Sequence, residues 1–205
     1  MNEGAPADFP PLSLSPAGLL SPLRKPLQID AQGLRCGRRA ASWDQLGYYR
    51  CRWRMAAIDQ LQVVADHAIF SLDGEYHDWR PAADRVLVRL HQRLVTAPQD
   101  FRPFDLEAGC LRHLLAGELP LGELASVRLE FRLGNTLTVV RRPKRDWVYC
   151  DLSEIHNVFL FLEALLAAHV PVDLDEPIGW PDATRDLQRL LQGAPRLPPA
   201  TIIKR

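Results

Sequence analysis

Arginine alternates with cysteine and tryptophan along one short stretch of this chain. Arg50, Arg52 and Arg54 are separated by Cys51 and Trp53, so a β-strand would place the three arginines on one face. Guanidinium groups beside an aromatic ring can form a stacking surface that binds phosphate. Alternatively, the arginines form a solvated strand face on which their aliphatic stems cover apolar surface. The residue pattern leaves both interpretations open.

A second basic group surrounds Pro143 and consists of Arg141, Arg142, Lys144 and Arg145. We predict that these residues lie at the tip of a β-hairpin, where charged side chains are commonly solvated. The functional alternative is contact with an acidic partner or with anionic lipid head groups. Together with the three arginines described above, these four residues are the candidate binding residues.

A general base is usually a histidine, and His156 beside Asn157 is the one candidate that the sequence offers. No serine or cysteine nucleophile can be tied to His156 by spacing, and a histidine near the start of a helix is usually structural. His67, His77 and nearby aspartates do not complete a metal-ligand set. Glycine-rich phosphate loops and nucleophile elbows are absent from the sequence. We therefore predict no catalytic residue, no metal site and no cofactor, and we do not expect an enzyme.

Composition and charge indicate an ordinary globular protein. The chain has 205 residues, of which 47% are apolar, and its 25 basic residues balance its 25 acidic residues. Such a balance gives no overall field that would select nucleic acid. The four cysteines form no Cys-x-x-Cys pair, so we expect reduced, half-buried thiols.

The sequence also bears on location. Residues 1–26 carry repeated prolines and no basic residue ahead of an apolar core, unlike a signal peptide. The most apolar stretch, at 151–172, is broken by Glu163 and falls short of the roughly 20 apolar residues that span a bilayer. We therefore expect no transmembrane segment and a cytoplasmic location.

Alternating apolar and polar residues predict a series of short strands from residue 27 onward. In the first half we expect strands at 27–29, 34–36, 37–39, 46–55, 61–65, 67–72 and 75–79, with a tight hairpin turn at Asp73-Gly74. Pro81 then suits the first turn of a helix. Its apolar stripe comprises Ala83, Val86, Leu87, Leu90 and Leu94.

The second half repeats the same order of predicted elements. We expect strands at 110–116, 126–133, 136–142 and 147–150, a turn at Gly117-Glu118, and a long helix at 151–172. The outer side of that helix, at Leu160, Phe161 and Ala164, should meet the first half or a short third helix predicted at 181–192. Because self-similarity of this period outweighs any single motif, we predict a duplicated domain.

Two local patterns carry a resemblance to a known family. IDAQGLRCG at 29–37 with WDQL at 43–46, and IHNVFLFLEAL at 155–165, resemble patterns of bacterial pleckstrin-homology-like (PH-like) proteins of unknown function. The resemblance implies an α+β, mainly β fold with two PH-like repeats, each a bent antiparallel β-sandwich or barrel capped by a C-terminal helix. The implied organisation is a Pro-rich leader at 1–26, repeats at 27–97 and 104–172, and a connector, short helix and tail at 173–205.

The family scaffold implies no fixed activity. Its phosphoinositide-binding members use a basic loop between the first two strands, whereas the corresponding turns here, at 31–33 and 107–109, contain no Lys or Arg. We therefore expect a non-catalytic protein that binds another protein as an adaptor, immunity or chaperone-like factor. Peripheral membrane or anionic-ligand binding through the arginine clusters is the alternative.

Overall fold

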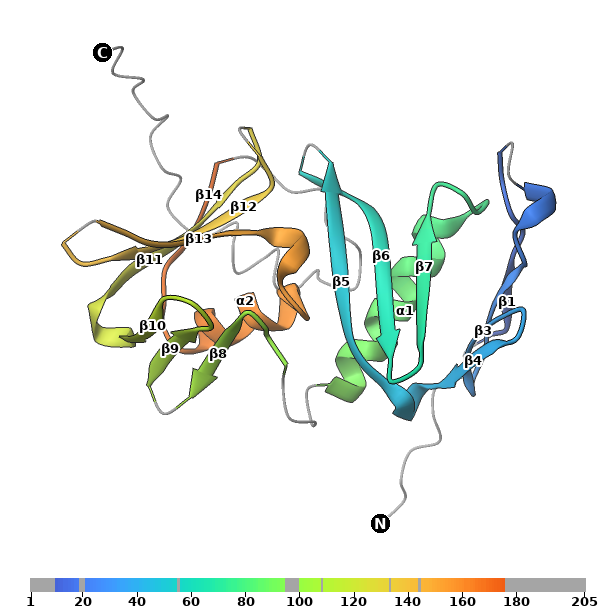
Figure 1. The fold of residues 1–205 in the computed structure, drawn as a ribbon, viewed down its shortest axis with the longest axis horizontal. Helices are drawn as coiled ribbons and strands as arrows, with labels where there is room; N and C mark the ends of the chain where they lie inside the picture. The colour runs from blue at the N-terminus through green and yellow to red at the C-terminus, as the bar shows by residue number, and fades with distance from the viewer. Residues whose placement is uncertain are drawn as a thin grey trace.

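The structure is a computed structural model that describes residues 10–18, 21–54, 56–94, 100–107, 109–132, 134–143 and 145–175. Over these residues the protein is mainly β, with antiparallel sheets and two α-helices (Figure 1). The expectation of a mainly β member of the α+β class is confirmed at this level. The third helix predicted at 181–192 lies outside the described residues.

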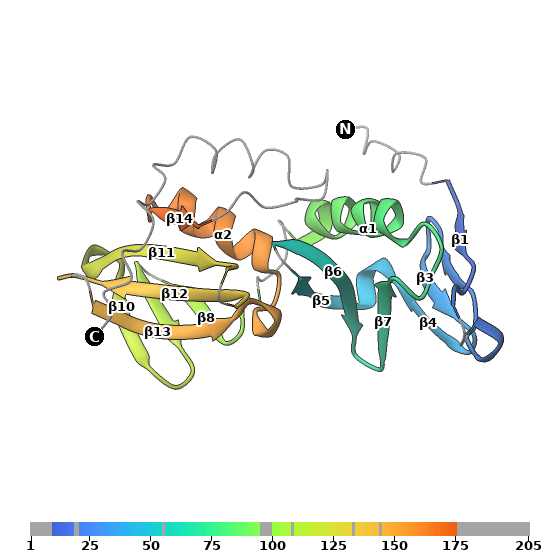
Figure 2. The same cartoon turned by 90° about the horizontal axis from the view of Figure 1, so that it is seen from above.

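The first half contains two antiparallel sheets and a helix. One sheet has four strands in chain order: β1 (Leu12–Leu14), β2 (Leu27–Ile29), β3 (Gly33–Cys36) and β4 (Arg39–Ser42). The other has three: β5 (Leu46–Arg54), β6 (Ala57–Ala65) and β7 (Ala68–Asp73). Helix α1 (Trp79–Leu94) lies along the second sheet, as both views show (Figures 1 and 2). Its predicted apolar stripe is buried.

The second half contains a three-stranded and a four-stranded sheet. The first is formed by β8 (Phe104–Glu107), β9 (Cys110–His113) and β10 (Gly117–Pro120). The second has the order β13 (Arg145–Asp151), β12 (Thr136–Arg141), β11 (Leu124–Glu130) and β14 (Val172–Leu174). Strand β14 runs parallel to β11, and helix α2 (Val158–Ala167) comes directly before it in the chain.

Both halves share one order of elements. From β2 and from β8, three short strands lead into a single 3₁₀ turn, η2 (Trp43–Gln45) or η3 (Leu121–Glu123), then three longer strands and a helix. In η2 the Gln45 side chain accepts the backbone N–H of Ser42, which closes a capping box. This shared order is what a duplicated domain would produce; the PH-like identity of each half stays a prediction.

The predicted strand at 75–79 is wrong. Strand β7 ends at Asp73, and residues 75–77 pair with the N-terminal segment: Ala17 N donates to Glu75 O at 2.7 Å, and His77 N donates to Ser15 O at 3.0 Å. The Asp73-Gly74 turn therefore does not close a hairpin. Within the predicted Pro-rich leader, residues 12–14 form β1, which pairs with β2, and Leu14 is buried.

The predicted strand at 110–116 and turn at Gly117-Glu118 are wrong by a few residues. Strand β9 ends at His113, the turn occupies 114–116, and Gly117-Glu118 begins β10. The stretch that was expected to be an acidic connector after 172 instead contains β14. Strand β14 adds one more strand to the sheet beside β11, and Val172 is buried there opposite Val127.

The long helix predicted at 151–172 is shorter than expected. Asp151 caps a 3₁₀ turn, η4 (Leu152–Glu154), where its carboxylate accepts the N–H of Ser153 at 2.8 Å. Asn157 then adopts the left-handed conformation (φ 49°), and α2 begins only at Val158. The break at Asn157 places this residue and His156 outside the helix, in contact with the first half of the chain.

Candidate functional site

The outer edge of β5 is closed by an asparagine from the second half. Asn157 donates its backbone N–H to Tyr49 O at 2.9 Å and accepts the Tyr49 N–H on Oδ1 at 3.0 Å. A second asparagine, Asn135, donates Nδ2 to Trp53 O at 3.1 Å. Asn157 thus imitates a pairing strand, and the contact joins residues 108 positions apart.

Aromatic packing reinforces this junction between the halves. The Phe159 ring lies 6.2 Å from the Tyr49 ring and 5.8 Å from the Trp53 ring. Phe161, which we expected to meet the first half or the third helix, stacks on Phe104 of the second half with ring centroids 5.0 Å apart. The third helix lies outside the described residues, so that alternative stays a prediction. Residues 158–162 of α2 are all buried, which is why the sequence pattern does not show which ring faces which half.

A polar cluster lies beside the junction and includes one residue of the first arginine group. The His156 ring stacks on Tyr48 with centroids 3.6 Å apart. Its Nε2 lies 2.6 Å from Nη2 of Arg50, and its Nδ1 lies 3.1 Å from Oδ2 of Asp100. Asp100 also receives a paired set of hydrogen bonds from Arg102, the shortest at 2.6 Å.

The charges of this cluster follow from its geometry. Burial alone would raise the pKa of Asp100, but the hydrogen bonds from Arg102 and His156 outweigh it and hold that pKa well below its usual range. Burial lowers the pKa of His156, partly offset by Asp100. A guanidinium can only donate, so Nε2 of neutral His156 accepts from Arg50 and its proton lies on Nδ1, toward Asp100. The ring's only lone pair therefore points at Arg50.

The other residues of the first arginine group do not join the cluster. Arg52 forms an ion pair with Asp59 of the neighbouring strand at 2.8 Å, and Arg54 is exposed. The three arginines share one face of β5, but their partners differ along the strand: Arg50 contacts His156 at the junction, whereas Arg52 contacts Asp59 on the neighbouring strand. Ion pairs of exposed side chains such as Arg52–Asp59 contribute only about 0–1 kcal/mol to stability.

The second basic group lies on the β12–β13 hairpin, as predicted from its turn residues. Arg141 pairs with Glu123 at 2.9 Å, and Arg142 donates its backbone N–H to Glu123 O at 2.7 Å. The side chains of Arg142 and Arg145 are exposed, whereas Lys144 lies outside the described residues.

The turn between β9 and β10 carries a feature that the sequence reasoning missed. Leu114 and Leu115 are 81% and 88% exposed. Their backbone is held in place, because Nδ1 of His113 accepts the N–H groups of Leu115 and Ala116, each at 3.3 Å, and Leu114 N donates to Pro103 O at 3.0 Å. Gly117 was the available sequence signal for the end of this turn, because glycine favours the left-handed backbone that it adopts here (φ 84°).

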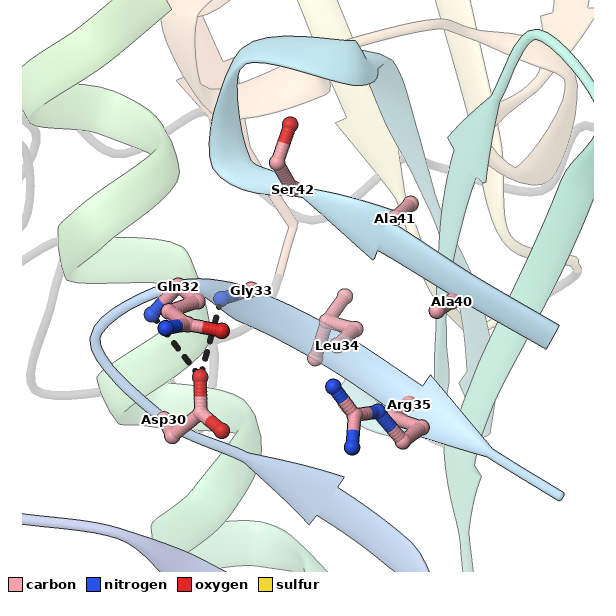
Figure 3. Close-up of a pocket in the computed structure, with 8 residues that line it drawn as sticks. All are labelled: Asp30, Gln32, Gly33, Leu34, Arg35, Ala40, Ala41 and Ser42. Atoms are coloured by element: carbon pink, nitrogen blue, oxygen red, sulfur yellow. Dashed lines mark hydrogen bonds between the residues drawn. The ribbon is translucent and has the colours of Figure 1, made fainter. Parts of the chain in front are cut away.

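A shallow hollow of about 120 Å³ lies between the β2–β3 turn and β4 (Figure 3). Asp30 closes one side, where its Oδ1 accepts the N–H groups of Gln32 and Gly33 at 2.8 and 3.2 Å. A side chain at Gly33 would lie 2.0 Å from Ala41 O, so the two strands approach closely here. Pockets for organic ligands measure about 300–1,000 Å³, and this hollow is well below that range.

Within the described residues, no group of three or more His, Cys, Asp or Glu side chains is placed to hold a metal ion. In the same part of the chain, neither helix is both long and apolar enough to cross a bilayer. Comparisons with protein-family models, with curated proteins and with solved structures found no match for this chain. The geometry described above therefore carries the functional argument.

Proposed function

We propose that this protein is a non-catalytic binding protein that acts through contacts with another protein on a tandem PH-like scaffold. An adaptor, immunity or chaperone-like role in the cytoplasm fits this class. The observation that carries the proposal is the β9–β10 turn, where two adjacent leucines are exposed on a backbone that is held by hydrogen bonds. Large apolar side chains presented in this way are typical of surfaces that bind other proteins.

Two further features support a binding role over a catalytic one. The lone pair of His156, the residue that sequence reasoning singled out as a general base, is directed at Arg50 2.6 Å away. The hollow beside Gly33, at about 120 Å³, is itself smaller than the usual pockets for organic ligands. The repeated element order and the helix that follows the strands of each half support the PH-like part of the proposal.

The proposal is tested by affinity capture of the tagged full-length chain from its native host, with quantitative mass spectrometry and an unrelated β-rich protein as control. We expect one protein to be enriched specifically and to bind the purified chain at about micromolar Kd or tighter. Enrichment of the same proteins by chain and control would refute the protein-binding role.

The second candidate is peripheral membrane or anionic-ligand binding through the basic hairpin. The exposed side chains of Arg142 and Arg145 favour it, since each basic residue near an anionic surface contributes about 1 kcal/mol of attraction. Co-sedimentation with phosphatidylserine vesicles provides the test, with Arg141, Arg142, Lys144 and Arg145 all replaced by Gln. This candidate requires binding by the wild type that the quadruple variant loses; equal sedimentation of both would exclude it.

A further inference from the structure

We propose that the β9–β10 turn, residues 113–117, is a preformed apolar anchor that inserts into an apolar pocket rimmed by lysine or arginine on a partner protein. This inference rests on the proposed protein-binding function and names its site and the chemistry of its partner.

The turn differs from the other exposed apolar positions of the described chain. The other exposed large apolar side chains stand singly in the sequence, and single exposed apolar side chains are common on protein surfaces; they are Leu23, Ile69, Val88 and Tyr149. Leu114 and Leu115 are consecutive and more than four-fifths exposed. Neither side chain contributes appreciably to the core, so packing within the described chain does not explain why both positions carry leucine.

His113 makes the turn a fixed structure. Its ring lies between Phe104, with centroids 5.0 Å apart, and Trp147, with centroids 6.4 Å apart. This position aims Nδ1 at the N–H groups of Leu115 and Ala116. Burial lowers the pKa of His113, partly offset by Glu154, so the ring is neutral and able to accept both. An ordered turn loses little conformational entropy on binding, which favours affinity.

The charges at the base of the turn select the partner. Strand pairing places Asp105, Arg112 and Glu118 side by side on the outer face of the β8–β9–β10 sheet. Arg112 is 2.9 Å from Glu118 and 3.6 Å from Glu107. Arg102, which lies beside the turn next to Pro103, is paired with Asp100 at 2.6 Å. The outer face of this sheet carries three carboxylates for one arginine, so the base of the turn has a net negative charge. It would repel an anionic bilayer and attract a basic rim, which favours a protein pocket.

The basic hairpin does not reverse this argument. The hairpin contacts η3 through Arg141 and Glu123. Turn η3 follows the last residue of β10, whereas the β9–β10 turn precedes its first residue. The apolar anchor and the basic group thus lie at opposite ends of β10, each with its own charge environment.

The first test places a photo-crosslinking amino acid at position 115 of the full chain in its native host, with position 69 as the matched control. We expect position 115, and not position 69, to yield one crosslinked protein that is the same protein captured by affinity. If affinity capture succeeds while position 115 gives no crosslink to that protein, the anchor is wrong and the binding function stands. If neither method recovers a specific protein, both proposals fail.

The second test measures Kd between the purified chain and the identified partner. Leu115→Ser should weaken binding about 30-fold, as expected for an anchor residue of about 2 kcal/mol, whereas Ile69→Ser should leave Kd unchanged. His113→Phe keeps a ring between Phe104 and Trp147 but removes the acceptor, and it should weaken binding about 10-fold without loss of folding. Equal Kd for Leu115→Ser and wild type would overturn the anchor.

Additional arms separate other occupants of the turn. Reversing the acidic base with Glu118→Lys should weaken partner binding and reduce its salt dependence; unchanged binding would remove the basic rim from the proposal. Sedimentation velocity of the wild type and of Leu115→Ser tests whether a second copy of the chain is the occupant. Co-sedimentation of the same two proteins with phosphatidylserine vesicles tests whether a bilayer is the occupant. Dependence on Leu115 in either of these two arms, in place of the partner assay, would overturn the proposal.

Discussion

Replacing Asn157 with alanine should break the junction between the two halves. Asn157 is 1% exposed, and its side chain accepts the Tyr49 N–H at 3.0 Å and donates to Asp100 O at 2.9 Å. Alanine removes both hydrogen bonds. The Tyr49 N–H is then buried without a partner, which costs about 1–3 kcal/mol, and the loss at the more accessible Asp100 costs about 1 kcal/mol.

The backbone adds to this loss. Asn157 has φ 49° and ψ 44°, a left-handed conformation that asparagine tolerates and that costs other non-glycine residues about 1 kcal/mol. The expected total is about 3–5 kcal/mol, a large share of the 5–15 kcal/mol by which domains are usually stable.

Urea unfolding followed by tryptophan fluorescence measures this free energy. Asn135→Ala is the matched control, because it removes one junction hydrogen bond, to Trp53 O, at an ordinary backbone conformation; we expect a loss of about 1 kcal/mol. Hydrogen exchange at the Tyr49 amide provides a local readout and should accelerate in Asn157→Ala. An Asn157→Ala variant within 1 kcal/mol of the wild type would refute the assignment of Asn157 as the residue that closes β5.

Three further predictions follow from buried groups. Burial lowers the pKa of His91 to about 4, so the unfolded chain, in which this pKa is about 6.5, binds the proton first as the pH falls. The free energy of unfolding should therefore fall by about 3 kcal/mol between about pH 6.5 and pH 4. In urea unfolding at a series of pH values, His91→Gln should flatten that decline. Phe159→Ala should lose about 3–5 kcal/mol and Phe159→Leu clearly less, and equal losses would contradict the packing against Tyr49 and Trp53. Burial raises the pKa of Cys51, and burial followed by Glu154 raises the pKa of Cys150 to about 12. Ellman's reagent should therefore label only the half-buried Cys36 and Cys110 before unfolding and all four thiols after it.

Local pattern predicted the longer elements well. The strand expected at 46–55 is β5 (Leu46–Arg54), and the strand expected at 136–142 is β12 (Thr136–Arg141). The apolar stripe of α1 was also predicted correctly. These elements follow from side-chain periods of two and 3.6 residues, which depend only on neighbours in the sequence.

The errors fall where a distant segment decides the local conformation. The Asp73-Gly74 pair favours a hairpin, but residues 75–77 pair with the N-terminal segment. The end of β9 depends on His113, whose ring accepts the N–H groups of the next turn once Phe104 and Trp147 hold it in position. Neither contact can be inferred from the spacing of residues in the sequence.

The candidate sites divide in the same way. The two basic groups are local runs, and their positions on a strand and a hairpin could be predicted from the sequence. The pairing of Arg50 with His156 could not, because it joins residues 106 positions apart. The exposure of Leu114 and Leu115 depends on the exact residue at which β9 ends, so an error of three residues turned the most prominent apolar feature of the surface into part of a strand.

The sequence by itself thus determined a mainly β chain with a repeated order of strands and helix, since burial of alternating apolar residues dictates that order. The tertiary structure alone decided which side chains are available to a partner. Asn157 turns His156 toward Arg50 and Phe159 toward β5, and His113 presents the two leucines to solvent. Each of these outcomes depends on a contact between residues that lie far apart in the sequence: Asn157 with Tyr49, His156 with Arg50, and His113 with Trp147.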